Sequence, residues 1–515
     1  MGNAVAAVDT QDLRPQRAQE LFFRTPARQR GLFVSPELND LIKVGGLGDV
    51  AASLPRALSR YYDMRVLIPG YRQVLNSGYP LEVVATLEGH AALPSCQIGQ
   101  MEMRDGLIVY VVLCDTLYDR TGNPYCDSSG RDWPDNHIRF ARLALAAAQM
   151  AAGAPHLDWQ PDLVHANDWP TGLTPCYMQL MGLNLPSIFT IHNLAYMGLF
   201  EQRCLCELGL PQRFANPEGF EYYGQLSFLK AGINYASHIT TVSQSYAREI
   251  TTPERGCGLE GVLRQKSHQA LLSGIANGID SDFDPSADHH LVSKFSYRNW
   301  KNRADNARYL EQYFAIEQDS GPLFGIVSRL VQQKGIDLTL EVADHLVSKG
   351  GRLIVFGRGE PELEERVKAL ESRYPRRVGV HIDFNETVAR RIFAGSDFLL
   401  MPSIYEPCGL SQMYAQCFGA LPIAHRTGGL ADTIEDGVTG ILFDRPCAEA
   451  YRAALDRAFD IYADPPLIAA MRGKAMVAPN YWHQAVKPYV SLYQTLIHDK
   501  PEQYGSFEVI EECRL

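Results

Sequence analysis

The chain has 515 residues, of which 46% are hydrophobic and 21% charged, the balance of a globular protein with a large core. A formal net charge of −11 argues against a nucleic-acid-binding surface, and no apolar run is long enough to predict a membrane span. The eleven cysteines form no paired C-x-x-C motif, so we expect reduced thiols and a cytoplasmic protein. Residues 1–30 are rich in arginine and lack the apolar stretch of a secretory signal, so we expect a mobile extension there.

Short apolar runs alternate with helix-length amphipathic stretches from residue 31 onward, which predicts βαβ units and parallel sheets. The strands predicted in the first half are Gly31–Val34, Met64–Ile68, Leu107–Leu113, Asp162–His165, Ser187–His192 and Ile239–Val242. Those in the second half are Leu323–Val327, Arg352–Phe356, Phe398–Met401 and Leu421–Ala424. We therefore expect two doubly wound lobes joined near Ser273–Ile279, where glycine and asparagine interrupt the chain. A last helix has one apolar face from Trp482 to Ile497, and Pro488 should kink it.

A glycine-rich segment follows the first predicted strand and reads Lys43-Val-Gly-Gly-Leu-Gly-Asp49. Glycines let the backbone approach a ligand, and the start of the following helix offers N–H groups to an anion, while Lys43 adds a positive charge. The spacing matches neither the dinucleotide-binding motif nor the P-loop, so neither kind of ligand follows from it. A tight turn with a solvated lysine is the alternative interpretation.

Three further motifs follow strands of the second half. Arg329 and Lys334 come after Leu323–Val327, and this pair suits a diphosphate, although it can also be a solvated charge pair. Glu406 comes after Phe398–Met401, where a carboxylate can hold sugar hydroxyls or stabilise positive charge at an anomeric carbon; otherwise it simply begins a helix. The segment Thr427-Gly428-Gly429 can offer amides to a phosphate or act as a plain helix cap.

Two polar clusters follow neighbouring predicted strands of the first half. They read His165-Ala-Asn167-Asp168-Trp169 and His192-Asn193-Leu-Ala-Tyr196. A single histidine of this kind is more often structural, but two clusters at equivalent strand ends favour a sugar site. The segment Asp280-Ser-Asp282-Phe-Asp284 has the spacing of a metal-binding D-x-D motif, but it falls at the expected join between the lobes, so we expect no metal site there.

Together these motifs resemble the family of bacterial glycogen synthases and plant starch synthases. The matching segments begin at Lys43, Gly122, His165, His192, Gly274, Ser328, Glu406 and Arg426. They run from the first predicted strand to the second lobe in the family's order, which chance does not explain. The resemblance implies the α/β GT-B fold, with two Rossmann-like lobes facing a deep cleft. It implies an acceptor-side lobe over 31–275, a donor-side lobe over 276–485, and a C-terminal helix and tail over 486–515 that crosses back to the first lobe.

The resemblance implies a retaining transfer of glucose from ADP-glucose to the non-reducing-end 4-hydroxyl of an α-1,4-glucan such as glycogen, without a metal or other cofactor. Catalytic roles are implied for Glu406, Lys334, Arg329, His165 and Asp135. Donor contacts are implied for Lys43, Gly45, Gly46, Asn277, Phe384, Cys408, Gly409, Leu410, Thr427, Gly428 and Gly429. The acceptor side is implied for Glu37, Asn167, Asp168, His192, Asn193 and Tyr196.

The sequence departs from the family pattern at three places. Asp40-Leu41 stands where the family usually has Pro-Phe, Asn167 replaces a common histidine, and Phe384 replaces a tyrosine expected to stack on adenine. No residue is an obvious covalent nucleophile, so we expect front-face attack by the acceptor, with the leaving phosphate taking its proton. The alternatives are a related enzyme that uses UDP-glucose or another acceptor, and a glucan-binding homologue with weak catalysis. The sequence leaves the oligomeric state open.

Overall fold

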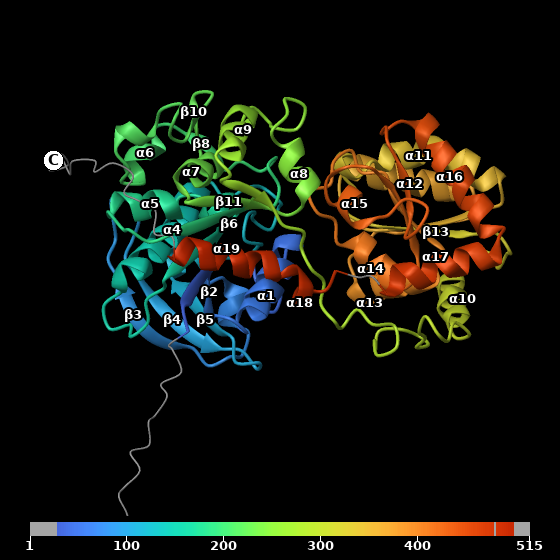
Figure 1. The fold of residues 1–515 in the computed structure, drawn as a ribbon, viewed down its shortest axis with the longest axis horizontal. Coiled ribbons are helices and arrows are strands. Elements are labelled where there is room, and N and C mark those ends of the chain that lie inside the picture. The colour runs from blue at the N-terminus through green and yellow to red at the C-terminus, as the bar shows by residue number, and fades with distance from the viewer. Residues whose placement is uncertain (1–27, 478–479, 499–515) are drawn as a thin grey trace, which may run out of the picture.

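A computed structural model describes residues 28–477 and 480–498, so almost all of the expected N-terminal extension and the tail after 498 lie outside the described residues. The chain forms two α/β lobes that lie side by side (Figure 1). Each lobe is built on its own sheet, and helices cover both faces. None of the described helices is both long and apolar enough to cross a membrane.

The first lobe contains a nine-stranded sheet. Its strands, in spatial order, are β12 (Leu272–Gly274), β11 (His238–Thr241), β7 (Ser187–Ile191), β6 (Leu163–Asn167), β1 (Arg30–Val34), β2 (Asp63–Pro69), β5 (Ile108–Leu113), β4 (Cys96–Glu102) and β3 (Glu82–Leu87). The strands from β12 to β5 are parallel, and β4 and β3 continue the sheet in antiparallel pairing. A small antiparallel sheet consists of β8 (Leu199–Glu201), β10 (Gln225–Ser227) and β9 (Glu221–Tyr222).

The helices of the first lobe connect these strands. They are α1 (Gly46–Leu58), α2 (Arg72–Leu75), α3 (Asp115–Tyr118), α4 (Asn136–Gly153), α5 (Thr174–Leu180), α6 (Cys204–Glu207), α7 (Phe228–Tyr235), α8 (Gln244–Glu249) and α9 (Glu260–His268). The central strands are buried along their whole length, as in β6 and β7, because helices cover both faces of a parallel sheet.

The second lobe contains a six-stranded parallel sheet. Its order is β15 (Val378–His381), β14 (Arg352–Phe356), β13 (Leu323–Val327), β16 (Phe398–Met401), β17 (Leu421–His425) and β18 (Ile441–Phe443). Its helices are α10 (Arg303–Tyr313), α11 (Ile336–Ser348), α12 (Pro361–Arg373), α13 (Glu386–Gly395), α14 (Ser411–Cys417), α15 (Gly428–Thr433), α16 (Ala448–Tyr462) and α17 (Pro465–Val477). The strand order reverses at β13 and β16, the position where open α/β sheets bind ligands.

All ten predicted strands are present, within two residues of the expected bounds. The sequence patterns missed the short strands β8, β9, β10 and β12, the antiparallel pair β3 and β4, and the edge strands β15 and β18. Six of these strands have only two to four residues, and β3 and β4 mix exposed with buried residues, so none of the eight gives a long continuous apolar run. In β3, for example, Glu82 and Val83 are exposed while Ala85 and Leu87 are buried.

The chain crosses between the lobes twice, and the two crossings are hydrogen-bonded to each other. The Ile279 N–H donates to Asn480 O at 2.9 Å, and the Trp482 N–H donates to Ile279 O at 3.1 Å. Gly278 lies against Trp482, where an added Cβ would come within 2.7 Å of the Trp482 backbone. Only a glycine lets these two segments approach so closely, so the connection between the lobes is a paired strip of chain.

The last two helices, α18 (Trp482–Ala485) and α19 (Lys487–His498), return to the first lobe, where α19 lies across its helices and strands (Figure 1). Trp482, Tyr489 and Tyr493 are buried in the core of that lobe. The return therefore begins four residues before the expected boundary at 486. The helix break precedes Pro488, which lies in the first turn of α19, where its missing N–H is not needed.

Candidate active site

The carboxyl ends of neighbouring strands from both lobes carry most of the predicted site residues. Arg329 follows β13, Glu406 follows β16, and Thr427 follows β17. In the first lobe, Asn167 ends β6 and His192 follows β7. The two sets meet, because the Arg329 guanidinium donates to the Tyr196 hydroxyl across the lobes at 3.3 Å. Both Arg329 and Tyr196 remain exposed to solvent.

Glu406 and Lys334 form the central charge pair of the second lobe. Lys334 Nζ lies 2.5 Å from Glu406 Oε2, and the Ser403 hydroxyl donates to the same oxygen at 3.0 Å. The Glu406 side chain is only 6% exposed. Gly335 has φ +67°, and an added Cβ would come within 2.0 Å of Pro402 O, so the motif needs glycine directly after Lys334. The arrangement sets a cation and a carboxylate side by side at the switch point of the sheet.

The glycine-rich loop before α1 is shaped by a buried carboxylate. Glu37 accepts hydrogen bonds from the Val44 N–H at 2.7 Å, the Gly45 N–H at 2.9 Å and the Tyr125 hydroxyl at 2.6 Å. Burial raises the pKa of Glu37 above its ordinary value, although these three donors oppose that shift. Because the Gly45 N–H is already engaged, Gly45 differs from the expected phosphate contact and shapes the loop instead.

Lys43 and Gly46 of the same glycine-rich loop lie at the surface of the protein. Lys43 is exposed and pairs with Asp49, with 2.7 Å between Lys43 Nζ and Asp49 Oδ1. Gly46 is exposed and faces the second lobe, where an added Cβ would lie 3.8 Å from Leu410 Cδ1. Gly409 has φ +68°, which turns the chain just before Leu410. Gly46 and Leu410 therefore face each other where the lobes meet, and the donor contacts implied for Lys43, Gly46, Gly409 and Leu410 stay predictions.

The two polar clusters of the first lobe bond to each other. The Asn167 amide nitrogen donates to Val34 O at 3.1 Å, and its oxygen lies 3.1 Å from His192 Nε2. Asp168 accepts from the His192 N–H at 3.2 Å and has φ +59°, a strained backbone for a residue other than glycine. Burial raises the pKa of Asp168 to about 7, while backbone hydrogen bonds from His192 and Asn193 oppose the shift.

His165 lies away from the surface, which differs from the sugar-side role that the resemblance implied. It is 0% exposed, and its ring nitrogens contact the Tyr493 hydroxyl at 2.8 Å and the Thr190 hydroxyl at 2.6 Å. Burial lowers the pKa of His165 to about 3, so the ring is neutral at pH 7. This position fixes α19 to the sheet and leaves no ring nitrogen for a substrate.

The last of the predicted site residues are Asn277, Cys408 and Phe384 from the donor side and Asn193 from the acceptor side. Asn277 is buried against Cys408, and its side-chain oxygen has no partner among the described residues. Burial raises the pKa of the Cys408 thiol to about 12, so it is not a thiolate at pH 7. Phe384, which follows β15, is 77% exposed and free to stack on a planar ring. Asn193 lies within hydrogen-bonding reach of the Tyr405 hydroxyl across the lobes.

Glu249 is a site residue that the sequence patterns did not identify. Its carboxylate, at the end of α8, accepts from the Gly428 N–H at 2.7 Å and lies 3.1 Å from the Thr427 hydroxyl. The turn Thr427–Gly429 that was expected to bind phosphate is therefore held by a carboxylate of the first lobe. The rule that ligands gather at strand ends could have signalled α8, since it follows β11 directly.

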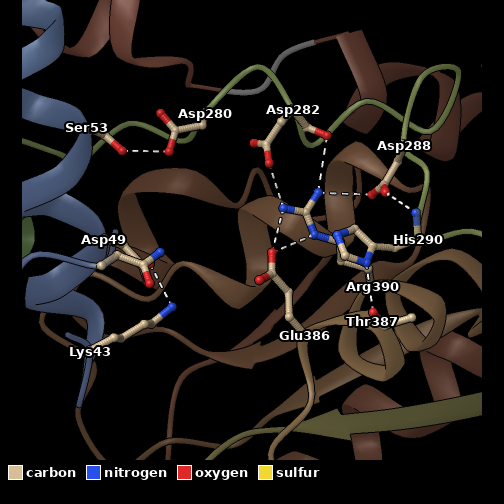
Figure 2. A network of polar contacts seen from close by, with 11 residues as sticks. Lys43, Asp49, Ser53, Asp280, Asp282, Asp288, His290, Glu386, Thr387 and Arg390 are labelled. Carbon is tan, nitrogen blue, oxygen red and sulfur yellow. Dashed lines mark hydrogen bonds and ion pairs between the residues drawn. The ribbon is translucent and has the colours of Figure 1, made fainter. Parts of the chain in front are cut away.

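Two further features of the sequence have side-chain partners within the protein, and the catalytic role implied for Asp135 stays a prediction. Asp135 is ion-paired with Arg120 at 2.6 Å, just before α4. Asp280 accepts from the Ser53 hydroxyl of α1 at 2.6 Å, and Asp282 pairs with Arg390 of α13 at 2.7 Å, so the first two of the three acids in the segment 280–284 have protein partners (Figure 2).

In the described part of the chain, two groups of histidine, cysteine or acidic side chains lie close enough together to hold a metal ion. They are His137, Cys204 and Glu207, and Asp288, His289 and His290. Neither group includes a predicted site residue.

Sequence comparisons identify relatives over nearly the whole chain. Residues 31–265 match the starch synthase catalytic domain family, and residues 312–470 match glycosyl transferases group 1. A glycogen synthase of Pseudomonas syringae pv. syringae is 60% identical over 470 residues, covering 91% of this chain and 97% of that protein. A glycogen synthase of Pseudomonas aeruginosa is 58% identical over 472 residues, covering 92% of each chain.

Structural comparison gives the same relationship. The catalytic domain of starch synthase IV from Arabidopsis thaliana, bound to ADP and acarbose, superposes with a TM-score of 0.81 at 26% identity, covering 92% of this chain and 100% of that one. A sucrose-phosphate synthase from Thermosynechococcus elongatus has a TM-score of 0.57 at 17% identity, covering 92% of this chain and 100% of that one, and shares the fold. The expected GT-B fold is confirmed.

Proposed function

Because the chain belongs to the glycogen synthase family of glycosyltransferases, we propose that it transfers glucose from ADP-glucose to the 4-hydroxyl at the non-reducing end of an α-1,4-glucan. One observation carries this proposal: the Glu406–Lys334 pair lies at the switch point of the second sheet, beside Arg329. The starch synthase relative is bound to ADP in its solved structure, which supports an adenosine diphosphate donor. Phe384, exposed after β15, offers a face for the adenine ring.

The charges of the site match the charges that develop during transfer. Cleavage of the bond between the sugar and the diphosphate leaves negative charge on the phosphate and positive charge on the sugar ring. Arg329 and Lys334 stabilise the leaving diphosphate, and the Glu406 carboxylate stabilises the ring or holds its hydroxyls. Two fixed cations supply the charge that a metal ion supplies in other transferases, so we propose that no metal is required.

The stereochemical course follows from the same groups. Lys334 already occupies one oxygen of the Glu406 carboxylate, and a retaining enzyme with a covalent intermediate needs a free carboxylate at the anomeric carbon. We therefore propose front-face attack, in which the acceptor hydroxyl passes its proton to the departing phosphate and the α configuration is kept. Contact between the lobes excludes water and limits hydrolysis of the donor.

The proposal is tested by supplying glycogen with ADP-glucose or UDP-glucose, each with chelator, and measuring the released nucleoside diphosphate. We expect ADP-glucose to be preferred and chelator to have no effect. Glu406→Ala should lower kcat by about 10³-fold, the scale of losing one preorganised charge in a transfer site. The matched control is Glu365→Ala, an exposed glutamate of α12, which should behave like the wild type.

Four outcomes would contradict the proposal. A preference for UDP-glucose would overturn the donor, and loss of activity with chelator would overturn metal independence. Full activity of Glu406→Ala would show that the Glu406 carboxylate is not needed for transfer. Digestion of the product by an enzyme specific for α-1,4 linkages tests retention, because an inverted product would resist it.

A further inference from the structure

Helix α8 belongs to the first lobe but packs against α15 of the second, and Figure 1 shows the two helices facing each other between the lobes. It begins at the carboxyl end of β11, with Ser243 as its N-cap. Three of its contacts cross to the second lobe. Ser243 Oγ donates to Pro407 O at 2.6 Å, Ser245 Oγ donates to Asp432 at 2.6 Å, and Glu249 binds the turn at Thr427–Gly428.

The turn that Glu249 holds is stacked directly on the backbone of Glu406. The Gly429 N–H donates to Glu406 O at 3.0 Å. Gly428 has φ +43°, and an added Cβ would come within 2.0 Å of Glu406 O, so no space separates the two segments. A shift of the turn at Thr427–Gly429 must therefore move the backbone of Glu406 or break this contact.

Glu406 itself has little freedom to compensate for such a shift. Its carboxylate is buried, and its position depends on the 2.5 Å contact with Lys334 and the 3.0 Å contact with Ser403. The Glu249 carboxylate gives the turn a charge-assisted hydrogen bond from Gly428 N–H, which is stronger than a bond between neutral groups. Since Glu249 comes from the other lobe, this hold exists only while the lobes are in contact.

We propose that Glu249 is a positioning residue for glucosyl transfer: it holds the turn Thr427–Gly429 from the first lobe and thereby sets the position of the Glu406 carboxylate. The inference rests on the proposed function of Glu406. It couples the approach of the lobes to the assembly of the catalytic carboxylate, so that the second lobe alone does not hold Glu406 in its reactive position. Glu249 touches neither Lys334 nor the reacting atoms and acts through the backbone.

Kinetics of two substitutions test this role. Glu249→Ala removes the acceptor, and we expect kcat to fall about 10- to 100-fold, the scale of a misplaced catalytic group, with KM for the donor within about threefold of the wild type. Glu249→Gln keeps an acceptor oxygen and should retain kcat within about threefold. The matched control is Ser245→Ala, which removes another cross-lobe hydrogen bond of α8 without touching the turn. Its kcat should stay at the wild-type value.

A second measurement is independent of turnover. Cys408 lies two residues after Glu406 and is buried, so its alkylation rate, followed by mass spectrometry of its peptide, reports on this loop. We expect Glu249→Ala to raise the rate at Cys408 at least tenfold and Ser245→Ala to leave it unchanged. Cys176, buried in the first lobe, is the internal reference for unfolding and should not react faster in either variant.

Each contrary result has a distinct meaning. An unchanged kcat and an unchanged Cys408 rate in Glu249→Ala would overturn the positioning role, as would an equal loss in Ser245→Ala or a parallel rise at Cys176. A loss confined to KM would also overturn it. Wild-type protein that turns over neither donor would contradict the proposed function instead, and the alkylation rates would still decide whether Glu249 holds the loop.

Discussion

Buried titratable residues in the first lobe link its stability to pH. The unfolded chain protonates His165 near its ordinary pKa of 6.5, whereas burial holds the folded pKa at about 3. The unfolded state therefore binds an extra proton between these values, and the stability that neutral His165 provides above pH 6.5 is lost as the pH falls toward 3. One such histidine changes the free energy of unfolding by at most about 1.4 kcal/mol per pH unit.

His165→Gln tests this linkage, since glutamine can make hydrogen bonds but does not titrate. At pH 7.5 we expect the variant to unfold at a lower urea concentration than the wild type. At pH 5.0 the difference between the two urea midpoints should be smaller. The measurement is the urea midpoint at both values. His268→Gln, at an exposed position in α9, should follow the wild type at both. A constant gap between the urea midpoints of His165→Gln and the wild type would contradict this linkage, because it would show that His165 takes up its proton at the same pH in the folded and unfolded states.

At the scale of elements, α19 is held by a polar contact inside an apolar core. Tyr493 packs on Tyr62, with 5.2 Å between ring centroids, and its hydroxyl reaches His165 from 328 residues away in the sequence. The Tyr62 hydroxyl donates to Val490 O at 3.0 Å. These contacts make the C-terminal helix part of the first lobe, although it follows the second lobe in the chain.

Tyr493→Phe keeps the ring and removes the hydroxyl, which leaves the His165 nitrogen without its partner. We expect a loss of about 1–3 kcal/mol in the free energy of unfolding, the usual result of stranding one buried polar group. Thermal unfolding followed by near-ultraviolet circular dichroism measures it. Tyr223→Phe is the control, because Tyr223 is 80% exposed. Equal melting temperatures for all three proteins would contradict a role for the Tyr493 hydroxyl.

At the scale of the whole molecule, the segment that connects the lobes is fastened to the second lobe by Arg390 of α13. Its guanidinium contacts Asp282 at 2.7 Å, Asp288 at 3.0 Å and Glu386 at 2.7 Å, as Figure 2 shows. The side chain of Asp288 is fully buried. Asp280, two residues earlier, accepts a hydrogen bond from Ser53 of the first lobe. The connecting segment is therefore bound to the first lobe at residue 280 and to the second lobe from residue 282 onward.

Arg390→Gln leaves the Asp288 carboxylate buried without its cation, which typically costs about 3–5 kcal/mol. We expect the connecting segment to detach and trypsin to cleave it faster at Lys294, Arg298 or Lys301. Limited proteolysis with mass spectrometry identifies the cleavage sites. Arg445→Gln removes an exposed ion pair with Glu449 and serves as the control. Cleavage at the wild-type rate would show that Arg390 does not fasten the segment.

The sequence by itself determined the two-lobed α/β fold and the strand ends that carry Arg329, Lys334 and Glu406. Apolar runs and glycine-rich turns are local signals, and parallel strands of one sheet end at the same edge, so these motifs could be brought together without coordinates. The family motifs added the donor and the acceptor as expectations. The other strands were not predicted because they are very short or, as in β3 and β4, mix exposed with buried residues.

Only the tertiary structure decided which partner each side chain has. Glu37 binds the glycine-rich loop and Tyr125, His165 binds Tyr493, and Glu249 binds Gly428, at separations of up to 328 residues. Periodicity shows which face of an element is buried, but not what lies opposite that face. These partners are determined by the register of the strands, by the packing of α19 and by the contact between the lobes. For this reason, the roles that the sequence indicated for His165 and Gly45 are not supported by the burial and hydrogen bonds of these two residues.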